Sequence, residues 1–308
     1  MKFLSLVIAL LIEQVRPLRQ GNVVYFAFRR YTEAVEGYLN AGEYRQGVLG
    51  WALVVVPPAL ITVLVYYALH RISPFVALAW SIVVLYLTMG FRQFSHYFTD
   101  ILQALRDGEV AAARNTLALW RGGADAQGAS DVARCAVELG LIGSHRHVFG
   151  PIVWFILLGP AGAVIYRTAA LLNDDWGLRG QHEVVEFGEF GRFARRCFFW
   201  LDWLPARVTA ASFAIVGNFE DAVYCWRTQA RSWAAKSHDV ILASGGGALG
   251  VRLGDAPREY EGTELRAELG MGDEADVDYM QSTVGLIWRA LVLWVFLVFL
   301  ITVAHSLG

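Results

Sequence analysis

Residues 48–69 constrain the fold most, because they contain no charged side chain. The hydrocarbon core of a bilayer requires about 20 mostly apolar residues in a helix, and this segment provides them. Pro57 and Pro58 stand in its middle, where each removes a backbone donor and is expected to kink the helix. The segment therefore predicts a transmembrane helix and makes the lipid bilayer an expected partner of the chain.

Further segments have a composition typical of membrane helices. Residues 73–91 follow the first segment after a connection that contains His70 and Arg71, so the two are expected to form an antiparallel hairpin. Residues 148–166 are apolar but interrupted at Gly159-Pro160. We predict an all-α, polytopic membrane protein of about five to six transmembrane helices in a single domain over 1–308. The spans are expected near residues 2–15, 48–69, 73–91, 148–166, 197–217 and 283–304.

The overall composition limits the classes of partner. The chain is 56% hydrophobic and only 18% charged, with a formal net charge of −2. A nucleic-acid partner is not expected, because such proteins normally carry a clear basic excess. Cys135, Cys197 and Cys225 are widely spaced and odd in number, which indicates structural thiols instead of a disulfide framework.

Positive charge predicts the orientation of the loops. If all six segments span, residues 16–47, 92–147 and 218–282 lie on one side, and that side holds most of the arginine and lysine. Such an excess is typical of the cytoplasm. Apolar residues recur at helical spacing over 94–105 and 110–120, which predicts amphipathic cytoplasmic helices. A further helix is expected over 131–139, capped by Ser130-Asp131.

Residues 197–217 are apolar and aromatic but contain Asp202, Pro205 and Arg207. A charge at membrane depth is costly unless it is paired or faces a cavity. We expect a helix broken at Pro205, across which Asp202 and Arg207 neutralise each other. The alternative is that Arg207 binds a carboxylate or phosphate through its bidentate guanidinium edge.

Two other features predict an anion site. Tyr166-Arg167 stand at the end of an apolar segment, where an arginine is expensive to keep. Residues 245–250 match the Gly-x-Gly-x-x-Gly pattern, but they lack the alternating strands and helices of a dinucleotide-binding fold. We expect a flexible or tightly packed glycine loop, in which a phosphate could approach the backbone amides. The candidate substrate- or anion-binding residues are Tyr166, Arg167, Asp202, Arg207, Gly245, Gly247 and Gly250.

Candidate metal ligands are weak in this sequence. His145 and His147 would point the same way only in an extended segment, and interfacial capping is the favoured interpretation. Acidic residues gather at 173–175, 183–189 and 273–278, where they could bind Mg²⁺ with phosphates. Solvated loops and helix N-caps are the favoured interpretation, so no metal site is predicted.

The order and spacing of several motifs resemble the CobD/CbiB family, membrane enzymes of adenosylcobinamide-phosphate synthesis. These motifs are residues 151–167, 204–207, 247–250 with 253–254, 260–262 and 272–273. The resemblance implies a bacterial inner-membrane enzyme that joins a corrinoid carboxylate to the amine of an aminopropanol phosphate. ATP and Mg²⁺ are the cofactors it implies, and a corrinoid is the implied substrate. A homo-oligomer is left open.

The chain departs from that family at three polar stretches. Residues 141–146 replace a Glu-Asn-Thr-x-Asp-Gly stretch, and residues 169–173 replace an Asn-Thr-Leu-Asp stretch. Phe198-Phe199 stand where a pair of aspartates is usual. These stretches carry polar groups suited to a metal or nucleotide, so the resemblance leaves amide ligation open.

The first half and the middle of the chain also resemble AmpE, an inner-membrane protein linked with β-lactamase induction. The residues concerned are 7–13, 90–92 with 96–97, 145–154, 201–207 and 215–220. This resemblance implies a non-enzymatic membrane sensor or accessory protein, in which the same arginines serve packing. The two resemblances therefore agree on the architecture and differ on the activity.

Overall fold

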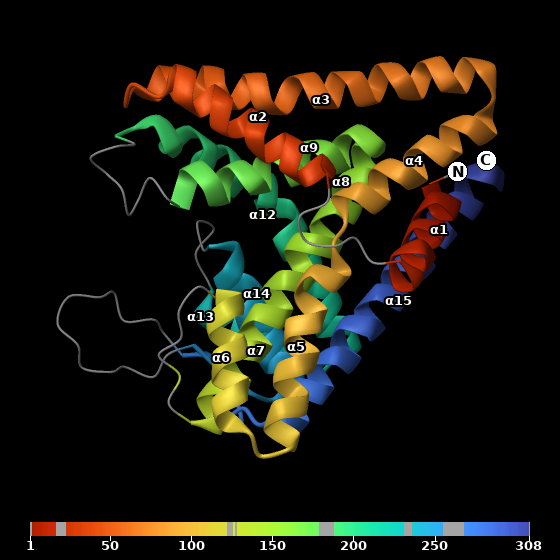
Figure 1. The fold of residues 1–308 in the computed structure, drawn as a ribbon. Helices are drawn as coiled ribbons and strands as arrows, with labels where there is room; N and C mark the ends of the chain where they lie inside the picture. Colours follow the sequence, from red (N-terminus) through yellow and green to blue (C-terminus); the bar gives the residue numbers. More distant parts are fainter. Residues whose placement is uncertain are drawn as a thin grey trace. The chain divides into compact units, whose positions relative to one another are not determined.

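The computed structural model describes residues 2–16, 23–121, 126, 128–178, 188–230, 236–254 and 268–307. Almost all of these residues are helical (Figure 1), which confirms the predicted all-α class. The described residues also contain two short strands, β1 (Arg252–Leu253) and β2 (Leu269–Gly270), which pair antiparallel. The chain divides into two compact units, and each is described by itself.

Unit 1 comprises Met1–Gln93, Arg146–Pro205 and Val298–Gly308. Its first part contains α1 (Lys2–Val15), α2 (Val23–Leu39), α3 (Tyr44–Ile72) and α4 (Pro74–Thr88). Its middle part contains most of the π-helix η1 (His145–Phe149), then α8 (Gly150–Leu158), α9 (Pro160–Leu172), the π-helix η2 (Asn173–Leu178) and the beginning of α12 (Phe190–Val216).

Three helices among the described residues are long and apolar enough to cross a membrane: Tyr44–Ile72, Ala129–Leu158 and Val277–Ala304. The predicted spans at 48–69 and 283–304 lie inside the first and the third. The helix α4 is apolar but shorter, and it follows α3 after Ser73 alone. The three long helices indicate a multi-pass membrane protein, while a count of five or six spans stays a prediction. The helix α3 runs through Pro57 and Pro58, and a kink there also stays a prediction.

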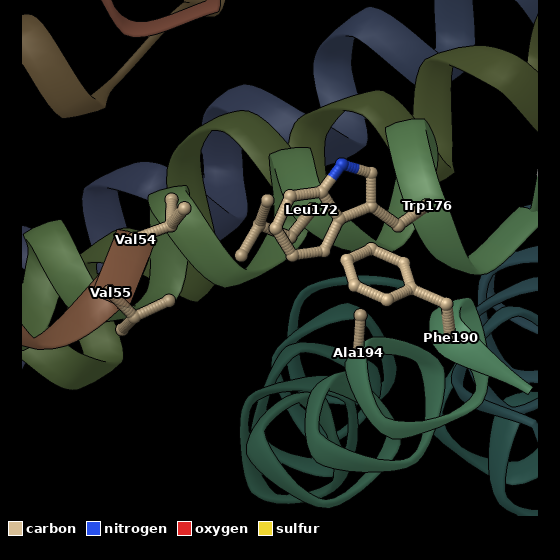
Figure 2. Close-up of a cluster of buried hydrophobic side chains, with 6 residues drawn as sticks. All are labelled: Val54, Val55, Leu172, Trp176, Phe190 and Ala194. Atoms are coloured by element: carbon tan, nitrogen blue, oxygen red, sulfur yellow. The ribbon is translucent and has the colours of Figure 1, made fainter. Parts of the chain in front are cut away.

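Close packing of α3 against η2 and α12 depends on two glycines. A Cβ at Gly47 would overlap the backbone carbonyl of Phe190, and one at Gly50 would lie 3.2 Å from the Phe190 ring. The resulting apolar cluster contains Val54, Val55, Leu172, Trp176, Phe190 and Ala194. Figure 2 shows the Trp176 indole beside Leu172, with its nitrogen on the side turned away from Phe190. This cluster joins residues far apart in the sequence and holds the elements that carry the polar groups of unit 1.

The structure divides the predicted span at 148–166 between two helices, and whether it crosses a membrane stays a prediction. Its interruption at Gly159-Pro160 is confirmed, because α8 ends at Leu158 and Gly159 adopts a φ of 71°. The helix α9 then packs against α8, and a Cβ at Gly162 would overlap the carbonyl of Trp154. The membrane-length helix therefore ends at Leu158 and extends back to Ala129 instead of forward to Tyr166.

The prediction of a helix broken at Pro205 is wrong, because α12 is one helix from Phe190 to Val216 with Pro205 inside it. Proline removes one backbone donor, but its fixed φ is close to the helical value. Apolar residues on the following turns, Ala206, Ala210 and Phe213, are fully buried. Their burial offsets the missing hydrogen bond, so the helix continues.

Unit 2 comprises Phe94–His145 and Ala206–Leu297. Its helices are most of α5 (Phe91–Arg106), α6 (Val110–Arg121), α7 (Ala129–Ser144), α13 (Phe219–Gln229), α14 (Ser237–Leu249) and most of α15 (Val277–Leu307). The amphipathic helices predicted within 92–147 are confirmed, since Phe98, Ile101 and Leu117 are buried. The helix α7 begins after Gly128, earlier than the predicted Ser130-Asp131 cap. It lies beside α5 and α6 (Figure 1).

The predicted glycine loop at 245–250 is also corrected. Gly245, Gly246 and Gly247 lie inside the buried helix α14, which ends at Gly250 in the left-handed conformation, with a φ of 71°. A Cβ at Gly246 would lie 2.8 Å from the Cα of Gly270, and one at Gly247 would lie 2.6 Å from the carbonyl oxygen of Asp221. Gly246 and Gly247 are tightly packed, which is one of the two predicted alternatives. The backbones of β2 and α13 lie directly against them.

Candidate functional site

The most enclosed polar contact in unit 1 joins Tyr166 of α9 to Asp202 of α12. The phenol of Tyr166 donates to Oδ1 of Asp202 at 2.7 Å, and both residues are buried. Gly150 makes room for the ring, since a Cβ there would overlap the phenol. A buried carboxylate requires such a donor, because an unsatisfied one carries a large desolvation cost. The structure therefore brings together two of the predicted site residues.

Arg146 of η1 lies beside this pair. Its Nη1 donates to Oδ1 of Asp174 at 2.9 Å, and its guanidinium carbon lies 5.4 Å from the centre of the Phe198 ring. Phe198 stands where the family resemblance led us to expect an aspartate, and here its ring supports a cation instead. This geometry combines an ion pair with a cation–π contact.

Arg167, the third predicted residue in unit 1, contacts His147. The Arg167 Nη1 and the His147 Nδ1 lie 3.0 Å apart. A guanidinium can only donate, so Nδ1 of His147 accepts and carries no proton in this arrangement. The backbone carbonyl of His147 accepts from the amide of Gly90 at 3.1 Å. The two contacts fix His147 on both its side chain and its backbone.

The two histidines of η1 do not share a ligand. His145 belongs to unit 2, where its Nδ1 lies 3.0 Å from the hydroxyl of Thr209, whereas His147 contacts Arg167 in unit 1. The π-helical backbone turns neighbouring side chains in different directions, so the extended geometry needed for a shared ion does not arise. Both histidines are instead held by other side chains.

The remaining predicted residues lie in unit 2. Arg207 follows Pro205 on α12, and Gly245, Gly247 and Gly250 belong to α14 or its end. Tyr166, Arg167 and Asp202 are therefore gathered in one unit, and the other four residues are in the other. Asp202 and Arg207 lie on one continuous helix. Asp202 accepts a hydrogen bond from the hydroxyl of Tyr166. The motif residues 260–262 lie outside the described residues.

The described residues do not form a recognisable site for Mg²⁺ or ATP. No group of three His, Cys, Asp or Glu side chains among them could hold a metal ion. Asp276 accepts from the amides of Asp278 and Tyr279, which makes it the cap of α15 and confirms the favoured interpretation of that acidic run. Gly246 and Gly247 of α14 are packed against backbone and Gly245 against the Leu141 side chain, so these glycines are not open to a phosphate.

The sequence did not identify three further residues near Tyr166 and Phe198, namely Arg146, Asp174 and Trp51. Arg146 stands between two histidines in the sequence, and Asp174 belongs to an acidic run that is typical of a solvated loop. Trp51 lies inside the first apolar segment, but it packs against the cluster of Tyr166, Ala169, Ala170 and Phe198. The only sequence signal was an arginine directly before an apolar segment, which is weak without the fold.

Comparisons with known proteins agree over nearly the whole chain. The family described as CobD/Cbib protein matches residues 6–302. A protein of Stutzerimonas stutzeri (strain A1501) named "Cobalamin biosynthesis protein CobD" is 32% identical over 299 residues, 95% of each chain. A protein of Chromobacterium violaceum with the same name is 32% identical over 237 residues, 72% of this chain and 74% of its own. No solved structure matches significantly. The resemblance to AmpE stays a prediction.

Proposed function

We propose that this chain, which belongs to the CobD/CbiB family, acts in cobalamin biosynthesis on a corrinoid substrate at the bacterial inner membrane. The proposal is supported by the family match over residues 6–302 and by relatives named for cobalamin biosynthesis. The three membrane-length helices support the location. In the proposed topology six segments span the membrane, and the loops 16–47, 92–147 and 218–282 face the cytoplasm.

One observation carries the assignment of the site. Tyr166 and Asp202 form a buried hydrogen bond, and Arg167 forms a part-buried contact with His147, both between helices that carry long apolar runs. Ionisable groups within membrane-embedded helices are expensive and usually mark a substrate site. We propose that these three residues bind the substrate. We further propose that Arg207 of unit 2 binds an anion, whereas Gly245, Gly247 and Gly250 serve the packing and the end of α14.

The proposed reaction is the one that the family resemblance implies, the joining of a corrinoid carboxylate to the amine of an aminopropanol phosphate. An AmpE-like accessory role is the second candidate. It is favoured by a specific observation, since Phe198 and Arg146 occupy positions where the family usually has acidic or polar groups. In that role the arginines would stabilise helix packing without turnover.

Complementation separates the two candidates. The full chain, expressed in a strain that lacks the synthase and is supplied with cobyric acid, is expected to restore cobinamide formation. Membrane abundance is measured in parallel by immunoblot of the membrane fraction. A strain that contains the protein in its membranes yet forms no cobinamide would exclude the enzymatic proposal and favour the accessory role.

Substituting Arg207 by alanine tests the contribution of α12. We expect Arg207→Ala to abolish cobinamide formation while membrane abundance stays at the wild-type level, because a substrate-binding guanidinium is lost without a change in the helix. Arg192→Ala is the matched control, since Arg192 lies on the same helix but is exposed and pairs with Glu189. A collapse of abundance in Arg207→Ala would show that Arg207 is structural and would remove it from the site.

A further inference from the structure

Among the buried hydrogen-bond donors of unit 1 without a partner in the described residues are Nε of Arg146 and Nε1 of Trp51. Buried polar groups are hydrogen-bonded in the great majority of cases, so each exception requires an explanation. Both atoms can only donate, because neither a guanidinium nor an indole nitrogen accepts a hydrogen bond. Each of these two nitrogen atoms therefore requires a hydrogen-bond acceptor, such as an oxygen atom.

The two donors border the same aromatic cluster. Trp51 packs against Tyr166, Ala169, Ala170 and Phe198, and the guanidinium of Arg146 lies 5.4 Å from the centre of the Phe198 ring. Trp176 has a third unpartnered indole nitrogen, but its side chain lies fully buried in the other cluster, with Val54, Leu172 and Phe190. Arg146 and Trp51 are thus the pair that one ligand could address.

The geometry of Arg146 leaves one edge for a ligand. Its Nη1 is engaged by Asp174 at 2.9 Å, which anchors the guanidinium and leaves the Nε edge without a partner. The side chain as a whole is 17% exposed while Nε itself is buried, so an anion would contact Nε only after neighbouring side chains move aside. Two parallel N–H donors along a guanidinium edge match the two oxygens of a carboxylate or phosphate.

We propose that Arg146 and Trp51 form a binding site for an oxyanion, in which the Nε edge of Arg146 donates to a carboxylate or phosphate and the Trp51 indole provides a further donor. Asp174 holds the guanidinium in place, and Asp202 is kept occupied by Tyr166. This inference rests on the proposed function only for the identity of the ligand, which would be the anionic group of the substrate.

The test uses the full chain, purified in a non-ionic maltoside detergent that contains no phosphate. Thermal unfolding is followed in sodium phosphate, sodium acetate and sodium chloride of equal ionic strength. A ligand that binds only the folded state raises the Tm. Phosphate or acetate is expected to raise the Tm above its value in chloride. The anion that raises the Tm more shows whether the site prefers a phosphate or a carboxylate.

Three variants locate the site. For each variant, the Tm in phosphate or acetate is compared with the Tm of the same variant in chloride. Arg146→Lys keeps the charge but loses the bidentate edge, and it is expected to weaken oxyanion binding about tenfold. Trp51→Phe removes the indole donor and should weaken binding in the same direction. Asp174→Asn removes a negative charge beside the guanidinium and should strengthen binding, a change of opposite sign that loss of packing would not produce.

The matched controls are Arg192→Lys, an exposed arginine of unit 1, and Trp154→Phe, whose indole already donates to the carbonyl of Leu201 at 3.1 Å. Both should bind the oxyanion as the wild type does. The proposal is overturned if neither anion raises the Tm above chloride, or if Arg146→Lys and Trp51→Phe bind with unchanged affinity. Arg146-dependent binding in a chain that fails complementation would overturn the proposed function and leave the site standing.

Discussion

Substitution of Gly150 by alanine is expected to destabilise unit 1 by about 3 kcal/mol, the upper part of the range for overpacking a tight site. The new Cβ would overlap the Tyr166 phenol, including its oxygen. Tyr166 would have to leave the position from which it donates to Asp202. The carboxylate would then remain buried without that donor, which adds to the cost of the overlap.

Thermal unfolding in detergent measures the loss of stability, and complementation measures the loss of function. Gly37→Ala is the matched control, because Gly37 lies inside α2 and a Cβ there meets nothing within 4 Å. That substitution should leave the stability unchanged or raise it by up to about 1 kcal/mol through helix propensity.

A double substitution shows whether Tyr166 is responsible. Gly150→Ala combined with Tyr166→Ala, which removes the ring, should cost less than the sum of the two single changes. If the two effects add, the alanine at position 150 acts through another neighbour, and Gly150 does not shape the Tyr166 site.

The long helices could be predicted from the sequence because their signal is local. Residues 48–69 and 283–304 are apolar over enough consecutive positions to identify a helix of membrane length, whatever surrounds them. The same holds for α5 and α6, where helical spacing of apolar residues marks the buried face. The end of α8 at Gly159 was also visible, since a glycine followed by proline interrupts a helix.

The errors arise where tertiary packing decides the outcome. Pro205 suggested a broken helix, but burial of the following turns keeps α12 continuous. The three glycines of α14 suggested a loop, but in the fold they allow α13 and β2 to approach a helix. In both cases a local preference of about 1–3 kcal/mol is outweighed by packing that the sequence does not display.

In the candidate site, some residues could be predicted from the sequence, but their contacts could not. Tyr166, Arg167 and Asp202 could each be selected because polar groups in apolar segments are costly. Their contacts could not be predicted, since Tyr166 and Asp202 are separated by 36 positions and meet only when α9 packs on α12. Arg146 was missed because its significance lies in what surrounds it: the Phe198 ring, Asp174 and an unpartnered Nε.

Substitution of Gly247 by alanine is expected to destabilise unit 2 by about 3 kcal/mol and to lower the Tm markedly. A Cβ at this position would lie 2.6 Å from the carbonyl oxygen of Asp221 and 2.8 Å from the Cα of Ala222. Both atoms belong to the backbone of α13, so relief requires that α13 and α14 move apart.

Gly245→Ala is the matched control on the same helix. There the nearest atom would be a Leu141 methyl at 2.8 Å, the end of a flexible side chain that can move aside. A smaller loss of Tm is therefore expected for Gly245→Ala than for Gly247→Ala. Thermal unfolding of the two variants in the same detergent provides the comparison, and complementation shows whether activity follows stability.

The outcome also decides whether Gly247 serves packing or substrate binding. If Gly247→Ala keeps the wild-type Tm but loses cobinamide formation, the packing argument is wrong and Gly247 contributes to substrate binding. If the Tm falls and activity falls with it, Gly247 acts by allowing α13 and α14 to pack. We expect the second result, because the glycine lies inside a buried helix whose amides are already bonded along the helix, and no amide there is left for a phosphate.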